Sequence, residues 1–257
     1  MCTGFVRKGK DLITGFNFDM NIGGMDYCPV IEKDRVFLGM RFSREVLDMM
    51  LESARPKNGI RLLQGVSAGG HVGGQLMNLN FSKTPEHWAP EMITNDLLTD
   101  TFVTEGWSCG QLTELLAQRE IVNIPDDGGL PPGMTSVAIH SLFTDPDGNI
   151  VFVEPGNGYA VIRERYFTVT NFSLLEPPLD LNEDQFGYYG VDRYRKSLSI
   201  LKESSDDFNV PDALQLLKEV RQTGEWGTRF SFVYSRNEDT VYYCLDGDFD
   251  SIQVHPF

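Results

Sequence analysis

The amino-acid sequence predicts an α+β fold, a four-layer αββα sandwich in which two antiparallel sheets face each other and helices cover their outer sides. Strand-like runs dominate the chain, helical periodicity is confined to four segments, and a turn-punctuated β-series runs from residue 135 to residue 171. Helices placed between blocks of antiparallel strands pack naturally on the outer faces of two sheets. The 257 residues are 41% hydrophobic and contain no linker-like stretch, so we expect a single domain over 1-257.

Strands are expected where apolar and polar residues alternate between turn signals. The first turn signal, at residues 9–11, predicts an N-terminal hairpin, and residues 145–149 (DPDGN) predict a tight turn in the middle of the chain. The expected strands are residues 3–8, 12–20, 37–41, 60–66, 75–81, 136–143, 150–154, 159–171, 228–235, 241–245 and 251–254. The glycine-rich stretch 65–74 lacks the ending of a phosphate-binding loop, so we interpret it as a flexible connection between strands.

Four segments place apolar residues at the spacing of one helix face. Two of them follow a serine that can cap a helix, Ser43 and Ser108, and the other two are expected over residues 192–203 and 212–221. Their apolar faces are, in chain order, Val46, Leu47, Met50 and Leu51; Leu112, Leu115 and Leu116; Tyr194, Leu198 and Leu201; and Leu216, Leu217 and Val220.

Net charge and cysteine usage restrict the partners and the location. The formal charge is 22 − 37 = −15, which argues against a nucleic-acid backbone or an anionic membrane surface as partner. No apolar run approaches the roughly 18 residues that span a bilayer, and the first residues lack the pattern of a signal peptide. The cysteines have no metal-ligand spacing, so we expect a cytoplasmic protein with reduced thiols and with Cys28, Cys109 and Cys244 buried.

Cys2 carries the most specific chemistry. If Met1 is removed, Cys2 has a thiol and a free α-amine a few ångströms apart. An unperturbed α-amine has a pKa of about 7.7–8.0, which suits a general base at neutral pH. A thiol is the most easily activated of the side-chain nucleophiles. One residue can then supply a nucleophile and its base; the alternative is a frayed terminus that happens to contain a cysteine.

The expected hairpin brings Asp19 beside Cys2. A loop of three or four residues at 9–11 puts Cys2 opposite Phe18 or Asp19, respectively. Alternation along the second strand places Phe18 on one face and Asp19 on the other. A carboxylate beside an α-amine can hold it in place and adjust its pKa. The simpler interpretation is a salt bridge at the end of a hairpin.

Asparagines occupy two of the expected strands. Asn78 and Asn80 share the polar face of the strand at 75–81, and Asn171 ends the strand at 159–171. Because asparagine is poor in strands, these residues need a polar purpose. One such purpose is a side-chain amide donor in an oxyanion hole, and another is a hydrogen bond to a neighbouring loop.

Taken together, these segments resemble the choloylglycine hydrolase family, which includes bile salt hydrolases, penicillin V acylases and related hydrolases of linear amides. The likeness follows the family order over nearly the whole chain. Its motifs are Met1-Cys2-Thr3-Gly4, Gly15-Phe16-Asn17-Phe18-Asp19, Asn78-Leu79-Asn80-Phe81, Val153-Glu154-Pro155, Thr168-Val169-Thr170-Asn171, Asp192-Arg193-Tyr194-Arg195, Trp226-Gly227-Thr228 and Phe232-Val233-Tyr234. The resemblance implies the αββα fold of the N-terminal-nucleophile (Ntn) hydrolases, with no metal or organic cofactor.

The resemblance also implies a catalytic role for five residues. Cys2 would be the nucleophile with its α-amine as base, and Asp19 would bind the amine. Asn80 would form the oxyanion hole with a backbone N–H. Asn171 would orient the nucleophile and substrate, and Arg193 would support the site electrostatically. In the implied reaction Cys2 attacks an amide carbonyl, an amine leaves, and water releases the acid from the thioester.

Two departures from the family narrow the expectation. Bile salt hydrolases carry an arginine where this chain has Phe16; losing that cation is expected to raise the pKa of the Cys2 thiol and to weaken binding of anionic substrates. Only 21 residues lie between Asn171 and Arg193, fewer than in the tetrameric bile salt hydrolases. We therefore expect a monomer or a small homo-oligomer.

Three functions remain open on the sequence. The first is hydrolysis of a small-molecule amide with an apolar acyl group, and the apolar residues available near the terminus to line its pocket, or to form core, are Phe16, Phe18, Met20 and Met25. The second is an acyltransferase, in which an amine takes the acyl group from the thioester. The third is a non-catalytic binding protein of the same fold, against which the joint presence of the five implied residues argues.

Overall fold

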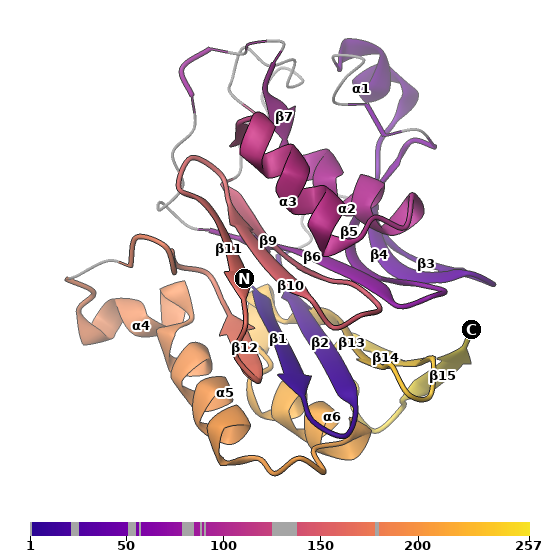
Figure 1. Ribbon diagram of the computed structural model, residues 1–257, viewed down its shortest axis with the longest axis vertical. Helices are drawn as coiled ribbons and strands as arrows, with labels where there is room; N and C mark the ends of the chain where they lie inside the picture. Colours follow the sequence, from indigo (N-terminus) through magenta and orange to yellow (C-terminus); the bar gives the residue numbers. More distant parts are fainter. Residues whose placement is uncertain are drawn as a thin grey trace.

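The computed structural model describes residues 2–21, 26–50, 55–56, 58–78, 85–87, 89, 91–124, 138–177 and 180–257. Within these residues two large antiparallel sheets lie face to face, and helices cover the outer side of each sheet (Figure 1). The arrangement has four layers in the order helix, sheet, sheet, helix. The predicted α+β sandwich is therefore confirmed.

The first sheet contains the N-terminal hairpin. Its strands, in spatial order, are β12 (Tyr166–Val169), β1 (Cys2–Lys8), β2 (Leu12–Asp19), β13 (Thr228–Ser235), β14 (Thr240–Leu245) and β15 (Gln253–Pro256). The predicted strand at 251–254 is thus displaced by two residues. β1 lies between β12 and β2, so the start of β1 has the end of a strand on each side.

The second sheet has seven strands. In spatial order they are β11 (Gly158–Ile162), β10 (Ile150–Glu154), β9 (Ile139–Thr144), β6 (His71–Met77), β5 (Ile60–Ser67), β4 (Arg35–Arg41) and β3 (Asp26–Glu32). β3 was not predicted. It is an edge strand with no buried face, so apolar and polar residues do not alternate clearly along it. It also contains Pro29, which lacks a backbone donor and is tolerated in a sheet only at such an edge.

The helices include the four that were predicted. They are α1 (Arg44–Met49), α2 (Asn95–Thr104), α3 (Cys109–Gln118), α4 (Glu183–Tyr189), α5 (Val191–Glu203) and α6 (Val210–Glu219), with a 3₁₀ turn at Gly224–Trp226 and a short parallel pair, β7 (Ile93–Thr94) and β8 (Ile121–Val122). Ser43 and Ser108 cap α1 and α3 as predicted. The helix α2 was missed because its buried face includes Asn95 and Thr99, which hide the apolar periodicity.

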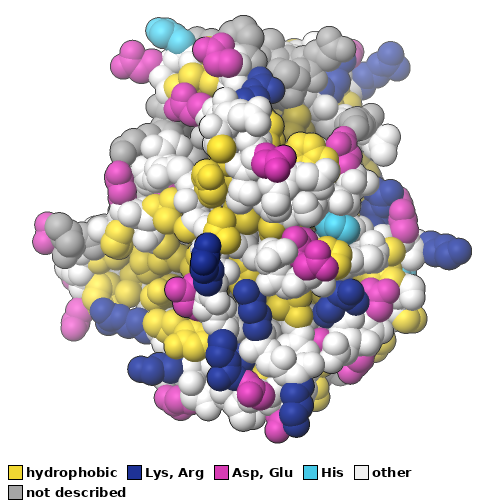
Figure 2. All heavy atoms as spheres, viewed as in Figure 1, with side chains coloured by type: hydrophobic (Ala, Val, Ile, Leu, Met, Phe, Trp, Pro, Cys, Tyr) yellow, Lys and Arg dark blue, Asp and Glu magenta, His cyan; other side chains and the backbone are white. Residues whose placement is uncertain are grey.

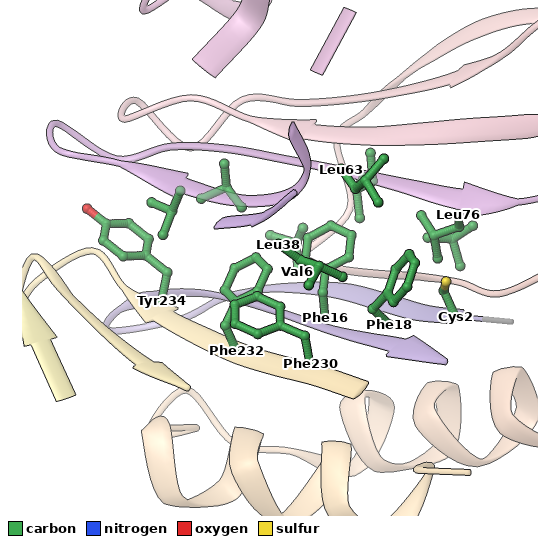
Figure 3. Close-up of a cluster of buried hydrophobic side chains, with 14 of the residues drawn as sticks. Cys2, Val6, Phe16, Phe18, Leu38, Leu63, Leu76, Phe230, Phe232 and Tyr234 are labelled. Atoms are coloured by element: carbon green, nitrogen blue, oxygen red, sulfur yellow. The ribbon is translucent and has the colours of Figure 1, made fainter. Parts of the chain in front are cut away.

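Three apolar clusters join the four layers. The cluster between the sheets includes Cys2, Val6, Phe16, Phe18, Leu38, Leu76, Phe230 and Phe232 (Figure 3). The cluster between the second sheet and the helices α2 and α3 includes Phe37, Leu98, Phe102, Leu112 and Phe143. The cluster between the first sheet and the helices α5 and α6 includes Phe5, Ile13, Leu201, Leu216 and Val233.

Two expectations about the strands are wrong. Residues 159–171 were expected as one strand, but the chain leaves the second sheet after β11 and enters the first sheet as β12. The connecting residues 163–165 are charged and exposed, so they mark the crossing. The glycine-rich stretch 65–74 does connect two strands, but the connection is only the turn at 68–70; Gly73 and Gly74 belong to β6, which begins at His71 and not at residue 75 as expected. A Cβ at Gly74 would lie 2.3 Å from the ring of Phe16, so close packing of the sheets requires glycine there.

The surface carries charges of both signs. In Figure 2 acidic and basic side chains are interspersed over the face shown, although acidic residues outnumber basic ones 37 to 22 in the whole chain. In the part of the chain that the structure describes, no helix is long and apolar enough to cross a membrane.

Candidate active site

The register of the N-terminal hairpin sets the neighbours of Cys2. Lys8 pairs with Leu12, so the loop has three residues and Cys2 pairs with Phe18. The next residue along β2, Asp19, pairs with Thr228 of β13. Of the two registers that the sequence allowed, the structure has the one for the shorter loop. Asp19 is one residue from the position opposite Cys2.

Cys2 has an apolar side and a polar side. Its side chain is 1% exposed and belongs to the cluster between the sheets, where the sulfur lies near Phe18 and Leu76 (Figure 3). Its backbone nitrogen donates to Asn171 Oδ1 over 2.8 Å. The thiol and the nitrogen, the two reactive groups expected of Cys2, therefore have separate surroundings.

Asn171 is held by three of its polar atoms. Its Oδ1 accepts from Cys2, its Nδ2 donates to the Met77 carbonyl at the end of β6 over 2.7 Å, and its backbone N–H donates to the Tyr189 carbonyl over 3.2 Å. Because Nδ2 faces a carbonyl and Oδ1 faces donors, the orientation of the side-chain amide follows from its partners. Asn171 thus connects the start of β1 with the second sheet.

Arg193 brings the remaining polar groups together. It lies in the first turn of α5, is 6% exposed, and its Nη1 donates to the Cys2 carbonyl at 2.8 Å and to Asp19 Oδ2 at 3.1 Å. Nη1 also lies 3.0 Å from Thr3 Oγ1, and Nη2 donates to Asn171 Oδ1 at 2.9 Å. A buried guanidinium with this many acceptors is a fixed feature of the site, since each lost partner would leave a buried charge unsatisfied.

Gly190 makes room for that guanidinium. It ends α4 and precedes α5 with φ of 75°, a left-handed conformation that favours glycine. A Cβ at this position would lie 2.4 Å from Nη2 of Arg193. The turn between the two helices therefore needs glycine for two reasons, its backbone conformation and the space of Arg193.

Asp19 is a fully buried carboxyl group. Thr228 donates its hydroxyl to Asp19 Oδ1 over 2.5 Å, and Arg193 pairs with Oδ2. Burial raises the pKa of Asp19 from 3.8 to about 6, and the Arg193 charge and the Thr228 hydrogen bond oppose that rise. The Asp19 carboxyl group therefore ionises in a pH range where most carboxyl groups are already ionised.

Burial also raises the pKa of the Cys2 thiol. A positive charge at the chain terminus opposes this rise, the Asp19 carboxylate adds to it, and the Asp19 backbone N–H and Arg193 oppose it. The first cause of the raised pKa is burial, and the rise expected from the missing cation at position 16 stays a prediction. A thiol in these surroundings needs a base to become a nucleophile.

The structure brings together four of the five residues to which the resemblance gives a catalytic role. Cys2, Asn171, Arg193 and Asp19 are connected by hydrogen bonds, whereas Asn80 lies outside the described residues. The hydrogen bonds place Asn171 at the Cys2 nitrogen and connect Asp19 to Cys2 through Arg193. Direct binding of the amine by Asp19 and the oxyanion role of Asn80 stay predictions.

The structure describes three of the four apolar residues that were expected around the substrate. Phe16 has no exposed surface, and its ring stacks on Phe232 with centroids 5.3 Å apart, so it packs as core. Phe18 and Met20 lie nearer the start of β1, and both contact Tyr27. Met25 lies outside the described residues. Substrate contacts by these side chains stay predictions.

Two polar residues of the site had no predicted role. Thr228 lay in a motif that carries the resemblance, but only the pairing of β2 with β13 shows that its hydroxyl meets Asp19. Tyr27 lies on the unpredicted strand β3, where burial, and then the charge of Cys2, raise the pKa of its phenol. Its hydroxyl donates to the Met20 sulfur over 2.7 Å. No sequence signal pointed to Tyr27.

The three other cysteines were expected to be buried. All four cysteines are free; Cys109 and Cys244 are buried as expected, whereas Cys28 is half-buried because it lies on the edge strand β3. Among the residues that the structure describes, no three His, Cys, Asp or Glu side chains are grouped as metal ligands would be.

Solved structures with the same fold include three named amide-cleaving enzymes. A mutant of the conjugated bile acid hydrolase from Clostridium perfringens is 15% identical over 99% of this chain and 92% of that chain, with a TM-score of 0.63. The penicillin V acylase from Agrobacterium tumefaciens is 12% identical over 95% and 83% of the two chains, with a TM-score of 0.54. The Caenorhabditis elegans orthologue of N-acylethanolamine-hydrolyzing acid amidase is 13% identical over 91% and 93%, with a TM-score of 0.50.

These structures establish the fold. Each of them is an Ntn hydrolase, so the Ntn hydrolase fold that the sequence resemblance implied is confirmed. No protein-family model matches the chain, and no curated protein matches its sequence. At identities of 12 to 15% the likeness extends to the fold and not to the substrate.

Proposed function

We propose that this protein is a hydrolase of linear amide C–N bonds, with Cys2 as the nucleophile and its α-amine as the base once Met1 has been removed. The observation that carries the proposal is the hydrogen bond from the Cys2 nitrogen to Asn171 Oδ1 at 2.8 Å. It holds the nitrogen on the polar side of the residue while the thiol lies on the apolar side. After removal of Met1 this nitrogen becomes an amine with a pKa close to neutrality.

The proposed reaction has two halves. The amine takes the thiol proton, directly or through a water molecule, and the sulfur attacks the carbonyl carbon of the amide. The tetrahedral intermediate collapses as the C–N bond breaks, and the leaving amine takes up the proton. Water then attacks the thioester with the same amine as base, and the acid leaves while Cys2 regains its thiol.

The polar network supports this mechanism by keeping Cys2 in place. Arg193 holds the Cys2 carbonyl and Asn171 holds the nitrogen, so the backbone on both sides of the Cys2 Cα is fixed. Fixed geometry of this kind avoids the entropic cost of ordering the nucleophile during the reaction. Asn80 supplies the oxyanion donor in this proposal, together with a backbone N–H.

An apolar acyl group suits the surroundings of the thiol. Phe18 and Leu76 flank Cys2, Tyr27 packs against Phe18, and Met20 contacts Tyr27. The neighbours named above act, by their names, on conjugated bile acids, penicillin V and N-acylethanolamines. These three amides and a series of N-acyl amino acids therefore form the panel on which this chain should be tested.

The test combines mass, turnover and one matched pair of variants. We expect intact-mass analysis of active protein to show that Met1 is absent, and at least one amide of the panel to be hydrolysed. Cys2→Ala should abolish turnover, whereas Cys28→Ala should retain it, because Cys28 is a free thiol of the edge strand β3. Turnover by protein that still carries Met1 would contradict the proposed base. Release of the amine with transfer of the acyl group to an added amine would identify an acyltransferase instead.

A further inference from the structure

The segment that contains Asn171 forms hydrogen bonds with the second sheet both before and after that residue. Before it, the His140 Nε2 donates to the Thr170 carbonyl over 2.7 Å. After it, the Glu154 carboxylate accepts from the Ser173 hydroxyl and from the Leu174 backbone N–H, the latter over 3.0 Å. These contacts lie outside the hydrogen-bond network that surrounds Cys2.

His140 and Glu154 occupy neighbouring positions in the second sheet. Val153 pairs with Ser141, so the next antiparallel step along β10 and β9 sets Glu154 opposite His140. Both side chains are fully buried. The His140 ring lies 5.2 Å from that of Phe152, a member of the cluster between the sheets, so the two polar side chains face the first sheet.

The protonation of His140 follows from its partner and its burial. A carbonyl oxygen only accepts, so Nε2 must carry the proton that it donates to Thr170. Burial lowers the pKa of His140 to about 4, while the charge of Glu154 and the bond to Thr170 oppose that change. The imidazole of His140 is therefore a neutral hydrogen-bond donor over the whole pH range in which the Cys2 amine would act as a base.

The position of Asn171 depends on this segment. Its Oδ1 has to reach both the Cys2 nitrogen and Arg193, at 2.8 and 2.9 Å, while its Nδ2 reaches Met77. A hydrogen bond is largely lost when its partners separate by a further ångström. Small displacements of residue 170 or residue 173 would therefore release the amide from the Cys2 nitrogen.

We propose that His140 and Glu154 are positioning residues of the active site, which act on Cys2 by fixing residues 170–174 and with them the side chain of Asn171. The catalytic part of this inference rests on the proposed function. The positioning part concerns the surroundings of the Cys2 thiol and is measurable without any turnover.

The experiment compares His140→Phe, which keeps a ring but removes the donor, with His140→Gln, whose amide can replace the Nε2 donor. Glu154→Gln is the third variant, because it keeps the volume and removes the charge that its donors share; these donors are Ser173, Leu174 and Leu175 of the segment and the side chain of Asn157. Thr144→Val is the matched control: Thr144 lies on the same strand and meets Thr14 of the first sheet at 3.5 Å, but at the end of β9 away from Asn171.

Two measurements follow on protein that lacks Met1. The first is the pH dependence of Cys2 alkylation by iodoacetamide, followed on the Cys2 peptide by mass spectrometry. We expect His140→Phe to move this curve upward by about one pH unit, because the displaced amine no longer favours the thiolate. The second is steady-state kinetics, in which kcat should fall between about ten- and a hundred-fold while KM changes less than about two-fold.

The variants separate positioning from general stabilisation. His140→Gln should recover most of the wild-type alkylation curve and kcat, Glu154→Gln should shift both in the direction of His140→Phe, and Thr144→Val should leave both unchanged. A folded His140→Phe protein with wild-type alkylation and kcat would overturn the inference, as would equal effects of His140→Phe and Thr144→Val. If His140→Phe does not fold, an unchanged alkylation curve for Glu154→Gln would overturn it.

The two proposals fail in different ways. A shifted alkylation curve in a protein that hydrolyses none of the amides supports the positioning of Cys2 and counts against the proposed function. Turnover that is untouched by any of the three variants supports the proposed function and counts against the positioning.

Discussion

Arg193 and Asn171 meet at a single oxygen: Nη2 of Arg193 donates to Asn171 Oδ1 over 2.9 Å, and the same oxygen accepts from the nitrogen of Cys2. This contact joins the first turn of α5, the end of β12 and the start of β1. Because each group has further buried partners, none of the three can move alone without breaking other hydrogen bonds.

Replacing Arg193 by lysine should disable the site. A lysine cannot reach in parallel the acceptors that the two Nη atoms now share, and it leaves part of a buried network unsatisfied. We expect Arg193→Lys to lower kcat/KM at least about a hundred-fold and the free energy of unfolding by about 3 kcal/mol. Kinetics and urea denaturation measure these effects. The control is Arg195→Lys, because Arg195 is exposed on the same helix; similar losses in both variants would contradict the prediction.

A methyl group at position 190 should displace the guanidinium of Arg193. Gly190 has φ of 75°, and an added Cβ would lie 2.4 Å from Nη2. We therefore expect Gly190→Ala to destabilise the protein by about 1 to 3 kcal/mol and to reduce kcat about ten-fold or more. Gly187→Ala is the control, because a Cβ at Gly187 meets nothing within 4 Å, and a helical alanine is favoured over glycine. Full activity in Gly190→Ala would show that Arg193 does not need this space.

Asp19 should make the protein less stable as the pH rises, whereas an ordinary ion-paired carboxylate makes a protein more stable as the pH rises. Its pKa in the folded protein is about 6, against an ordinary value of 3.8, so the folded state binds the proton more tightly than the unfolded chain does. The stabilisation is present below pH 4 and is lost as the pH rises through 6. Relative to Asp19→Asn, the wild-type protein should lose about 2 to 3 kcal/mol of unfolding free energy between pH 4 and pH 7. Urea denaturation at several pH values measures the difference; a constant or increasing difference would exclude the raised pKa.

Thr228 should lower the pKa of the same carboxyl group. Its hydroxyl donates to Asp19 Oδ1 and so favours the ionised form. Thr228→Val should therefore raise the pKa of Asp19 further and cost about 1 to 2 kcal/mol of stability at neutral pH. Thr228→Ser keeps the hydroxyl and should leave the pKa near its wild-type value. The carboxyl resonance of Asp19, followed by NMR against pH, measures both; identical titrations in the two variants would contradict this role.

Local pattern was enough to predict most of the fold. Alternation and turn signals gave the N-terminal hairpin to within one residue of register, and the three-residue loop then decided that Cys2 pairs with Phe18. The capping serines gave the starts of α1 and α3. Periodicity failed where polar residues are buried: Asn95 in α2 donates to the Ile139 carbonyl and accepts from Ser141, which a pattern of apolar residues does not reveal.

The site was less predictable because its residues meet through tertiary packing. The resemblance named Asp19, Asn171 and Arg193, but only the structure shows that Arg193 connects the other two with Cys2. His140 had no sequence signal. Its contact with Thr170 requires the chain to cross from one sheet to the other between β11 and β12, which the single strand predicted at 159–171 excluded.

The ring of Phe16 has an evolutionary consequence. It fills the space that a side chain would take at two glycines, since a Cβ at Gly4 or Gly74 would lie 2.6 or 2.3 Å from it. A larger residue at either glycine becomes tolerable only after the ring has been replaced by a smaller group, and loss of the ring alone leaves a void between the sheets. The three positions should therefore be epistatic: among descendants of this sequence, Phe16 can be exchanged for a smaller residue at low cost only where Gly4 or Gly74 has also changed.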